Sequence, residues 1–223
     1  MKQTLIANRT NYDAPWAADF LRSLFHPGMK AVILPPIEQE GWASERDAWL
    51  AEFGRDSDHR YDMERPLRSY GIREFVWWDG DSLSLEHLFS EIEEADVLVI
   101  FGDDPHPCMR MLEDTGLDEA VKQFDGVLVV LSEAAQIITA RFGERYEMQE
   151  GLGLIQGASL CMHYDESEAQ MRKMIHTLET QEPHVLVLSD RSGVYFEEGH
   201  IELLGDAFIA EEEDLEELYA LIA

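Results

Sequence analysis

Short, uninterrupted apolar runs recur along the chain, and each one ends at residues that break strands. Strands are predicted at residues 30–34, 74–78, 96–101, 126–131 and 184–188. These runs are rich in Val, Leu and Ile and lack alternating polar positions, which is typical of strands buried on both faces of a parallel sheet. The first run ends at Pro35-Pro36 and the second at Asp79-Gly80, and both pairs are turn signals.

Amphipathic segments lie between these runs and predict helices. Residues 13–25, 44–53, 83–95 and 167–178 repeat apolar side chains at helical spacing. We expect Asp13 to cap the first of these helices. The predicted buried faces carry Trp16, Phe20, Leu21, Leu24 and Phe25, then Trp49, Leu50 and Phe53, then Leu85, Leu88, Phe89 and Ile92, and last Met171, Met174, Ile175 and Leu178. Strands that alternate with helices in this way predict an α/β fold with a mainly parallel sheet.

The C-terminal part of the chain follows a different pattern. Segments 193–196 and 200–204 flank Glu197-Glu198-Gly199, which predicts an antiparallel hairpin. The acidic run at 211–217 is expected to begin a last helix, because carboxylates favour helix N-termini. The length of 223 residues fits one compact domain, or at most two small ones.

The net charge excludes several classes of partner. The chain has 46 Asp and Glu against 17 Lys and Arg, a formal charge of −29. This excess opposes binding to nucleic acids and to anionic membrane surfaces, and it fits either ordinary solubility or a salt-rich interior. No apolar run approaches the roughly 20 residues of a membrane span, and the first seven residues are too short and polar for a signal peptide. Two cysteines, Cys108 and Cys161, cannot build a disulfide framework, so we expect a cytoplasmic protein.

Ser132 is the first candidate for chemistry, because the buried run 126–131 leads directly into it and a helical pattern follows. This is the position of a nucleophile elbow, in which the next N–H, here that of Glu133, faces the developing oxyanion. Elbows favour small residues two positions before and after the nucleophile. Ala134 fits this requirement, but Val130 does not. The alternative is that Ser132 only caps the following helix.

At this point the order of segments resembles that of the peptidase E and cyanophycinase-type serine peptidases. That family shows a strand leading into Gly-Gly-Asn-Thr, then Gly-x-Ser-Ala-Gly-Ala, and then Gly-Leu-Gly-Leu ahead of a strand ending in Pro-His-Phe. The corresponding segments here are residues 94–105, 131–135, 151–156, 160–166 and 187–199. The resemblance implies that residues 1–223 form a single class I glutamine amidotransferase-like domain. Its fold would be a three-layer sandwich with a mainly parallel, flavodoxin-like sheet, helices on both faces and the C-terminal hairpin.

The resemblance also implies an activity and site residues. Ser132 matches the nucleophile, His163 matches the general base, and Gly102 matches the first glycine of the oxyanion-hole motif. The family's third catalytic residue is a carboxylate between the serine and the histidine; Glu147 falls near that spacing, and Glu150 is the second choice. The implied reaction is serine-dependent hydrolysis of short peptides. A peptide or another small molecule would be the substrate, no cofactor is expected, and an oligomer is compatible with the sequence.

The site motifs depart from the family pattern at three positions by introducing a carboxylate. Asp103 replaces the second glycine, Asp104 the asparagine and Glu133 an alanine. Carboxylates beside an oxyanion oppose its charge, and losing one oxyanion donor typically costs about 2.7–4 kcal/mol of transition-state stabilisation. The sequence therefore predicts reduced or lost activity, and a catalytically inactive relative that acts as a binding module is the alternative.

A metal-assisted hydrolase is a weaker alternative. Oxygen-rich sites with one or two imidazoles can hold Mn²⁺, Zn²⁺ or Mg²⁺. The side chains that would supply such ligands are Asp103, Asp104, His106, Glu133 and His163. No HExxH or CxxC spacing supports this, and residues 103–107 are more simply a polar turn before a helix. We therefore expect no metal site, and we expect Cys161 to be a buried small hydrophobe.

Overall fold

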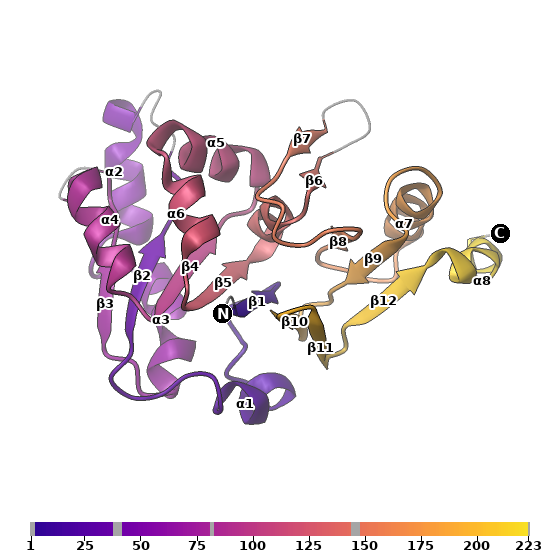
Figure 1. Cartoon of the computed structure of the whole chain (residues 1–223), viewed down its shortest axis with the longest axis horizontal. Helices are drawn as coiled ribbons and strands as arrows, with labels where there is room; N and C mark the ends of the chain where they lie inside the picture. The colour runs from indigo at the N-terminus through magenta and orange to yellow at the C-terminus, as the bar shows by residue number, and fades with distance from the viewer. Residues whose placement is uncertain (1–2, 38–41, 81–82, 144–147, 223) are drawn as a thin grey trace.

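The central element of the computed structural model is a seven-stranded sheet in the order β11-β10-β1-β5-β4-β2-β3 (Figure 1). The model describes residues 3–37, 42–80, 83–143 and 148–222. The parallel strands are β1 (Gln3–Ala7), β5 (Val127–Leu131), β4 (Val97–Phe101), β2 (Lys30–Leu34) and β3 (Glu74–Trp77). An antiparallel hairpin of β10 (Ser192–Glu197) and β11 (His200–Gly205) extends the sheet beyond β1. The predicted mainly parallel sheet and C-terminal hairpin are confirmed.

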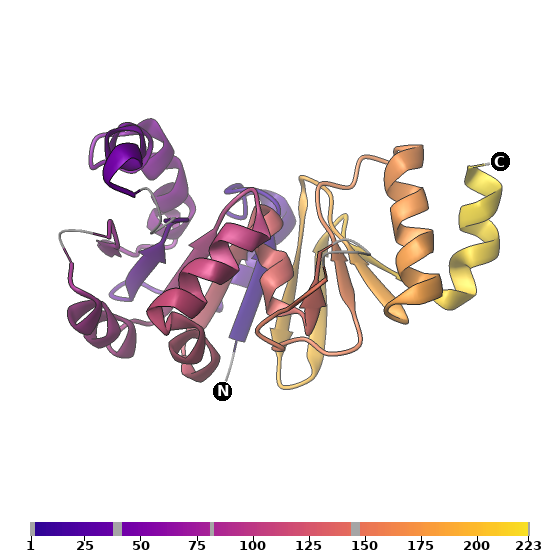
Figure 2. The ribbon, with the colours of Figure 1, turned by 90° about the horizontal axis from the view of Figure 1, so that it is seen from above.

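Helices cover both faces of this sheet, as the expected three-layer arrangement requires. Figure 2 shows α2 (Trp42–Phe53) and α3 (Asp58–Ser69) on one side, and α4 (Leu85–Glu93), α5 (Pro105–Thr115) and α6 (Leu117–Gln123) on the other. α1 (Pro15–Leu21) packs against the β10–β11 hairpin. Within the described residues, none of the helices combines the length and the apolar character needed to cross a bilayer.

A second, three-stranded sheet lies beside the first and has a small core of its own. It contains β8 (Ser159–Cys161), β9 (His184–Val187) and β12 (Phe208–Glu211), in the order β12-β9-β8. α7 (Glu168–Thr180) and α8 (Leu215–Leu221) pack together beside it (Figure 1). A 3-10 turn at Glu212–Asp214 leads into α8. The predicted strand at 184–188 therefore belongs to this sheet, not to the central one. Between the sheets run η1 (Ser132–Ile138) and a short ribbon of β6 (Arg141–Phe142) and β7 (Gln149–Glu150).

Several local predictions differ from the structure. β1 was not predicted, because it begins with polar Gln3 and Thr4 and leaves an apolar run of only Leu5, Ile6 and Ala7. α3 was missed as well, since its exposed face is strongly polar. Asp13 does not cap α1; Ala14 holds the N-cap position, and Asp13 pairs with Arg65 of α3.

Two leucines on the predicted buried faces are more exposed than expected. Leu50 is 36% exposed and Leu85 is 37% exposed, whereas Trp49, Leu88 and Ile92 on the same helices are buried. The helical period therefore identified the buried faces, but it assigned them slightly too much width.

Glu64 fixes α3 to the sheet. Its carboxylate is only 6% exposed and accepts a hydrogen bond from the Trp77 indole N–H at 2.8 Å. Arg60 Nε at 3.2 Å and Arg68 Nε at 2.9 Å, one helical turn away on either side, donate to the same carboxylate. This buried charge is fully partnered, so it holds α3 and the neighbouring Met63 in place without an uncompensated desolvation cost.

Replacing Glu64 with Gln should lower the free energy of unfolding by about 3 kcal/mol, because two arginines and one indole lose a charged acceptor in a buried site. Urea denaturation followed by circular dichroism measures this change. The matched control is Glu168→Gln, which weakens an exposed pair with Arg172 at the same i,i+4 spacing. That change should cost less than about 1 kcal/mol. Equal losses in the two variants would contradict the role assigned to Glu64.

Candidate active site

Three neighbouring strands of the central sheet end in register, and this brings their following residues together. Leu131 at the end of β5 pairs with Ala7 of β1 on one side and with Phe101 of β4 on the other. The chain then continues as Ser132 after β5, as Asn8 and Arg9 after β1, and as Gly102 and Asp103 after β4. The carboxyl edge of a parallel sheet is the usual place for a ligand site in this class of fold.

Ser132 has the backbone conformation of a nucleophile elbow. Its φ is 59°, and the other non-glycine residues with positive φ in the described chain are His163, Glu166 and Glu198. Such conformations are rare for L-residues and concentrate at functional sites. Leu131, not Ser132, occupies the N-cap position of η1, so the helix-cap interpretation of Ser132 is wrong.

Gly102 and Ala134 allow the elbow to form despite Val130. The Ala134 N–H donates to the Gly102 carbonyl at 2.9 Å, which ties the turn after Ser132 to the end of β4. A Cβ atom at residue 102 would lie 2.7 Å from Cys108 Sγ, so this close approach requires glycine. Val130 stays inside β5 and is fully buried, two residues before the turn. The small residues that the turn needs are therefore Gly102, directly after β4, and Ala134 of η1.

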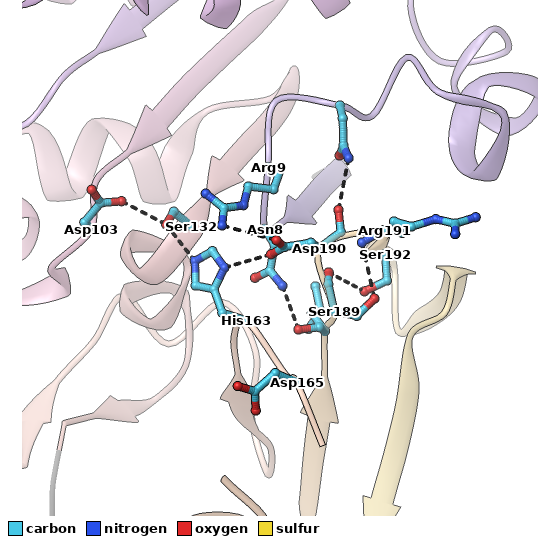
Figure 3. A network of polar contacts seen from close by, with 12 residues as sticks. Asn8, Arg9, Asp103, Ser132, His163, Asp165, Ser189, Asp190, Arg191 and Ser192 are labelled. Atoms are coloured by element: carbon cyan, nitrogen blue, oxygen red, sulfur yellow. Dashed lines mark hydrogen bonds and ion pairs between the residues drawn. The ribbon is translucent and has the colours of Figure 1, made fainter. Parts of the chain in front are cut away.

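The hydroxyl of Ser132 contacts an imidazole that is itself held by a carboxylate (Figure 3). Ser132 Oγ lies 3.0 Å from His163 Nε2, which confirms the predicted proximity of these two side chains. His163 Nδ1 lies 3.1 Å from Asp190 Oδ1. Ser132 Oγ also donates to Asp103 Oδ1 at 3.1 Å. The hydroxyl therefore lies within hydrogen-bond distance of two groups, the His163 ring and the Asp103 carboxylate.

The second sheet brings His163 and Asp190 together by the same kind of register. Cys161 of β8 pairs with Val187 of β9 in parallel, and Leu188 N–H donates to the Cys161 carbonyl at 2.9 Å. His163 and Asp190 therefore leave adjacent strand ends. The Gln170 side chain of α7 donates to the His163 carbonyl at 2.8 Å and supports the turn, where His163 has a φ of 53°.

Two asparagines and one arginine after β1 dock the second sheet onto the first. Asn8 Nδ2 donates to the Leu188 carbonyl at 2.6 Å, and Asn11 Nδ2 donates to the Asp190 carbonyl at 3.0 Å. Arg9 Nη2 lies 3.2 Å from Asp190 Oδ2. Arg9, and to a lesser degree His163, hold the pKa of Asp190 below its ordinary value, so this carboxylate stays ionised at neutral pH.

Asp190 is the carboxylate that contacts His163 within the described residues, a contact for which the sequence proposed Glu147. Glu147 lies outside the described residues, and Glu150 is exposed on β7, in register with Arg141. A signal for Asp190 was present, since Ser189-Asp190 ends the predicted strand at 184–188. By itself this pair indicates only the end of a strand, and the family resemblance implies a third residue before His163 rather than after it.

A cavity of about 800 Å³ opens beside Ser132. Asp103 and Asp104 line it, as do buried apolar side chains from α2, α3 and β4. Glu133 lines a separate cavity of about 110 Å³ that it shares with Cys161 and Gln170, and its carboxylate accepts a hydrogen bond from Gln136. Of the three carboxylates that the sequence placed near the oxyanion, two therefore line the cavity that contains Ser132.

The possible metal ligands have other partners. Asp104 caps α5 by accepting a hydrogen bond from the His106 N–H at 2.9 Å, and the His106 ring lies against Phe142. In the part of the chain that the structure describes, no three His, Cys, Asp or Glu side chains are grouped so that they could share an ion. Burial raises the pKa of the Cys108 thiol to about 12 and that of Cys161 to about 11, so neither has the character of a reactive thiolate.

The fold has a solved counterpart. A crystal structure from Listeria monocytogenes EGD-e, provisionally described as a peptidase E protein, matches this chain with a TM-score of 0.67. The match covers 91% of this chain and 98% of that chain, at 12% sequence identity. The chain has a peptidase E-like fold. No protein-family model matches it, and no curated protein sequence does.

At 12% identity, the similarity establishes the peptidase E-like fold and not the chemistry. The groups that could take part in chemistry are the side chains at the carboxyl edge of the sheet. In this peptidase E-like fold those are Ser132, His163 and Asp190, with Arg9 behind the aspartate and Asp103 in front of the serine.

Replacing Arg9 with Gln should raise the pKa of Asp190 toward its ordinary value of 3.8. The pKa is lowered in the folded state, so the ionised carboxylate stabilises the fold above its unfolded-state pKa, and this contribution disappears as the pH falls through the folded value. Without Arg9 the folded-state pKa of Asp190 is higher, so the stabilising contribution of this carboxylate is smaller and is lost at a higher pH. An NMR titration of the Asp190 carboxyl carbon measures the change.

Asp165 provides an internal control in the same titration. Its pKa is lowered by a hydrogen bond from Ser167, with no contribution from Arg9. The Asp165 carboxyl should therefore titrate at the same pH in Arg9→Gln as in the parent protein. An unchanged Asp190 titration would show that Arg9 does not set its ionisation.

Proposed function

We propose that the protein is a serine hydrolase of short peptides, with Ser132 as nucleophile, His163 as general base and Asp190 as the carboxylate that orients the histidine. One observation carries the proposal. An unbroken chain of contacts runs from Ser132 Oγ to His163 Nε2 at 3.0 Å and from His163 Nδ1 to Asp190 Oδ1 at 3.1 Å, with Ser132 on a positive-φ elbow. Nucleophile, base and orienting group in this sequence of contacts are the requirements for covalent acyl transfer.

In the proposed reaction, Ser132 Oγ attacks the carbonyl carbon of a peptide bond while His163 Nε2 accepts the hydroxyl proton. Asp190 stabilises the resulting imidazolium through Nδ1–H. His163 then gives the proton to the leaving amine as the C–N bond breaks, which leaves an acyl ester on Ser132. A water molecule, deprotonated by His163, cleaves the ester and restores the serine hydroxyl. Asp190 remains an anion throughout, which fits the lowered pKa that Arg9 gives it.

The backbone supplies the groups that would stabilise the oxyanion. The N–H of Glu133 follows the elbow directly, and the N–H of Asp103 lies just past the adjacent strand end, as in a two-donor oxyanion hole. The Glu133 carboxylate is bonded to Gln136 and lines the smaller cavity. The sequence predicted three carboxylates near the oxyanion, Asp103, Asp104 and Glu133. Because Glu133 lines a different cavity, fewer negative charges oppose the oxyanion than the sequence predicted, and this supports an active enzyme.

The cavity also suits a small substrate. A volume of about 800 Å³ lies within the usual range for small-molecule sites, roughly 300–1,000 Å³. This size favours short peptides over folded protein chains.

The contact between Ser132 and Asp103 favours a second function. A hydroxyl that donates to Asp103 cannot at the same time donate to His163, and the negative charge of Asp103 opposes an oxyanion. A catalytically inactive protein that binds a peptide in the cavity is therefore the second candidate. Chemical labelling of the serine separates the two candidates.

A fluorophosphonate probe should label the protein covalently at neutral pH, because the probe reacts with serines activated by a neighbouring base. Ser132→Ala should abolish the label and any peptidase activity. Mass spectrometry of the labelled peptide locates the modified residue. A protein that folds normally but takes up no label at Ser132 would favour the binding function.

Asp190→Asn should reduce the rate of peptide hydrolysis about 10³- to 10⁴-fold, because the imidazole loses the acceptor that holds its tautomer and stabilises its charge. The matched control is Glu150→Gln, which removes a carboxylate exposed on β7. Its rate should stay within about twofold of the parent. A strong loss of hydrolysis rate in Glu150→Gln and a weak loss in Asp190→Asn would show that Asp190 is not the carboxylate that orients His163.

A further inference from the structure

We propose that Asp103 binds the α-ammonium group of the substrate, so that the enzyme is an aminopeptidase for peptides whose first residue has a large apolar side chain. This inference rests on the proposed function. Its starting point is a contact that a hydrolase would otherwise be expected to avoid, the carboxylate of Asp103 at 3.1 Å from the Oγ atom of Ser132.

The covalent geometry of a peptide brings an amino-terminal nitrogen within reach of this carboxylate. In an N-terminal residue, the nitrogen and the carbonyl carbon are two bonds apart, a distance of about 2.5 Å. Before attack, the carbonyl carbon lies about 3–3.5 Å from the nucleophilic oxygen. The ammonium nitrogen is therefore within roughly 6 Å of Ser132 Oγ, in the shell that the Asp103 carboxylate occupies. The negative charge of Asp103 would therefore distinguish a peptide with a free amino terminus from one with a blocked terminus.

The ammonium group would have a second effect, because the Ser132 hydroxyl has only one proton to donate. The hydroxyl has one proton and two acceptors, Asp103 Oδ1 and His163 Nε2. When Asp103 accepts a hydrogen bond from a substrate ammonium, its charge is compensated and the serine proton is free to be donated to His163. A substrate with a free amino terminus thus removes the contact that opposes attack, and it also offsets the negative charge near the oxyanion. A blocked amino terminus does neither.

The floor of the cavity determines the side chain that fits. Phe101 contacts Phe53 with ring centroids 5.4 Å apart, and Phe53 contacts Trp49 at 5.5 Å. These rings and Met63 line the cavity, and each of them is at most 7% exposed. An aromatic or aliphatic side chain buried against them gains hydrophobic contact.

Among the described residues that line this cavity, the basic side chains already have acidic partners. Arg9 is paired with Asp190 at 3.2 Å, and His59 lies 3.6 Å from Glu52. Asp104 adds a further carboxylate to the lining. Like-charge repulsion therefore disfavours peptides that begin with Asp or Glu.

The reaction that follows from this binding mode is the one already described, applied to the first peptide bond. The acyl group on Ser132 is the N-terminal residue with its ammonium at Asp103. The leaving group is the amine of the second residue, which takes its proton from His163. Water releases the first amino acid, so each cycle shortens the peptide by one residue.

The test compares phenylalanine 4-nitroanilide with its N-acetyl form, in the parent protein and in Asp103→Asn. The parent should cleave the free amine with a kcat/KM at least about tenfold higher than the acetylated form, the effect of one charge-assisted hydrogen bond. Asp103→Asn should bring this ratio close to one by slowing the free amine. It should label with a fluorophosphonate at least as fast as the parent, since that probe carries no ammonium and no longer faces the negative charge.

Two controls make the comparison specific. Asp62→Asn removes the same charge from the α3 side of the cavity and should leave the ratio within about twofold of the parent value. Glutamate 4-nitroanilide should be a poorer substrate than the phenylalanine compound. The labelling rate of Asp103→Asn also reports that the variant is folded and that its serine is active.

Three outcomes would overturn the inference. They are equal rates for the free and acetylated compounds in the parent, an equal loss for both compounds in Asp103→Asn, and a preference for the glutamate compound. Each of them leaves Ser132-dependent labelling intact and so is distinct from failure of the proposed function. Absence of labelling at Ser132 would overturn both.

Discussion

The buried amide of Asn8 donates to the Leu188 carbonyl at 2.6 Å, and this hydrogen bond joins the end of β1 to the end of β9. Ser132 belongs to the central sheet and the His163–Asp190 pair to the second sheet, so the relative position of the two sheets decides whether they meet. Asn11 and Arg9, which follow β1 as well, bond to Asp190 and reinforce the same junction. A five-residue strand at the start of the chain thereby aligns groups that come from three distant segments.

Local strain and electrostatics then adjust the groups that the sheets bring together. Ser132 and His163 both have positive φ, which L-residues adopt at a cost, and packing around the Ala134–Gly102 hydrogen bond keeps the serine turn in place. Arg9 keeps Asp190 ionised, so the carboxylate behind His163 is already charged before any substrate arrives. These features hold the side chains of the site in position, and the lowered pKa of Asp190 also adds to the stability of the fold above the unfolded-state pKa.

The acidity of the chain has two consequences that composition alone does not separate. Most of the 46 acidic residues lie exposed in the described part of the chain, so the charge of −29 is spread mainly over the surface. At the site, the position of each carboxylate decides its effect. Glu133 is held by Gln136 and lines another cavity, whereas Asp103 contacts the serine hydroxyl directly. In the proposed aminopeptidase, this remaining charge becomes a binding group for a cation.

The apolar runs and helical stripes determined the α/β class, most of the sheet strands and the strand-to-helix position of Ser132, because hydrophobic periodicity reports burial directly. The pairing of Ser132 with His163 followed from family resemblance and not from periodicity. Sequence could not show that Asp190 contacts His163 and Arg9, because these contacts join segments 27 or more residues apart. It placed Asp103 near the expected oxyanion, but it could not show the contact of Asp103 with the Ser132 hydroxyl. Only the parallel registers of β1, β5 and β4, and of β8 and β9, decide which of many carboxylates lies beside the histidine. The reason is that register is set by pairing between distant strands, and no local pattern encodes it.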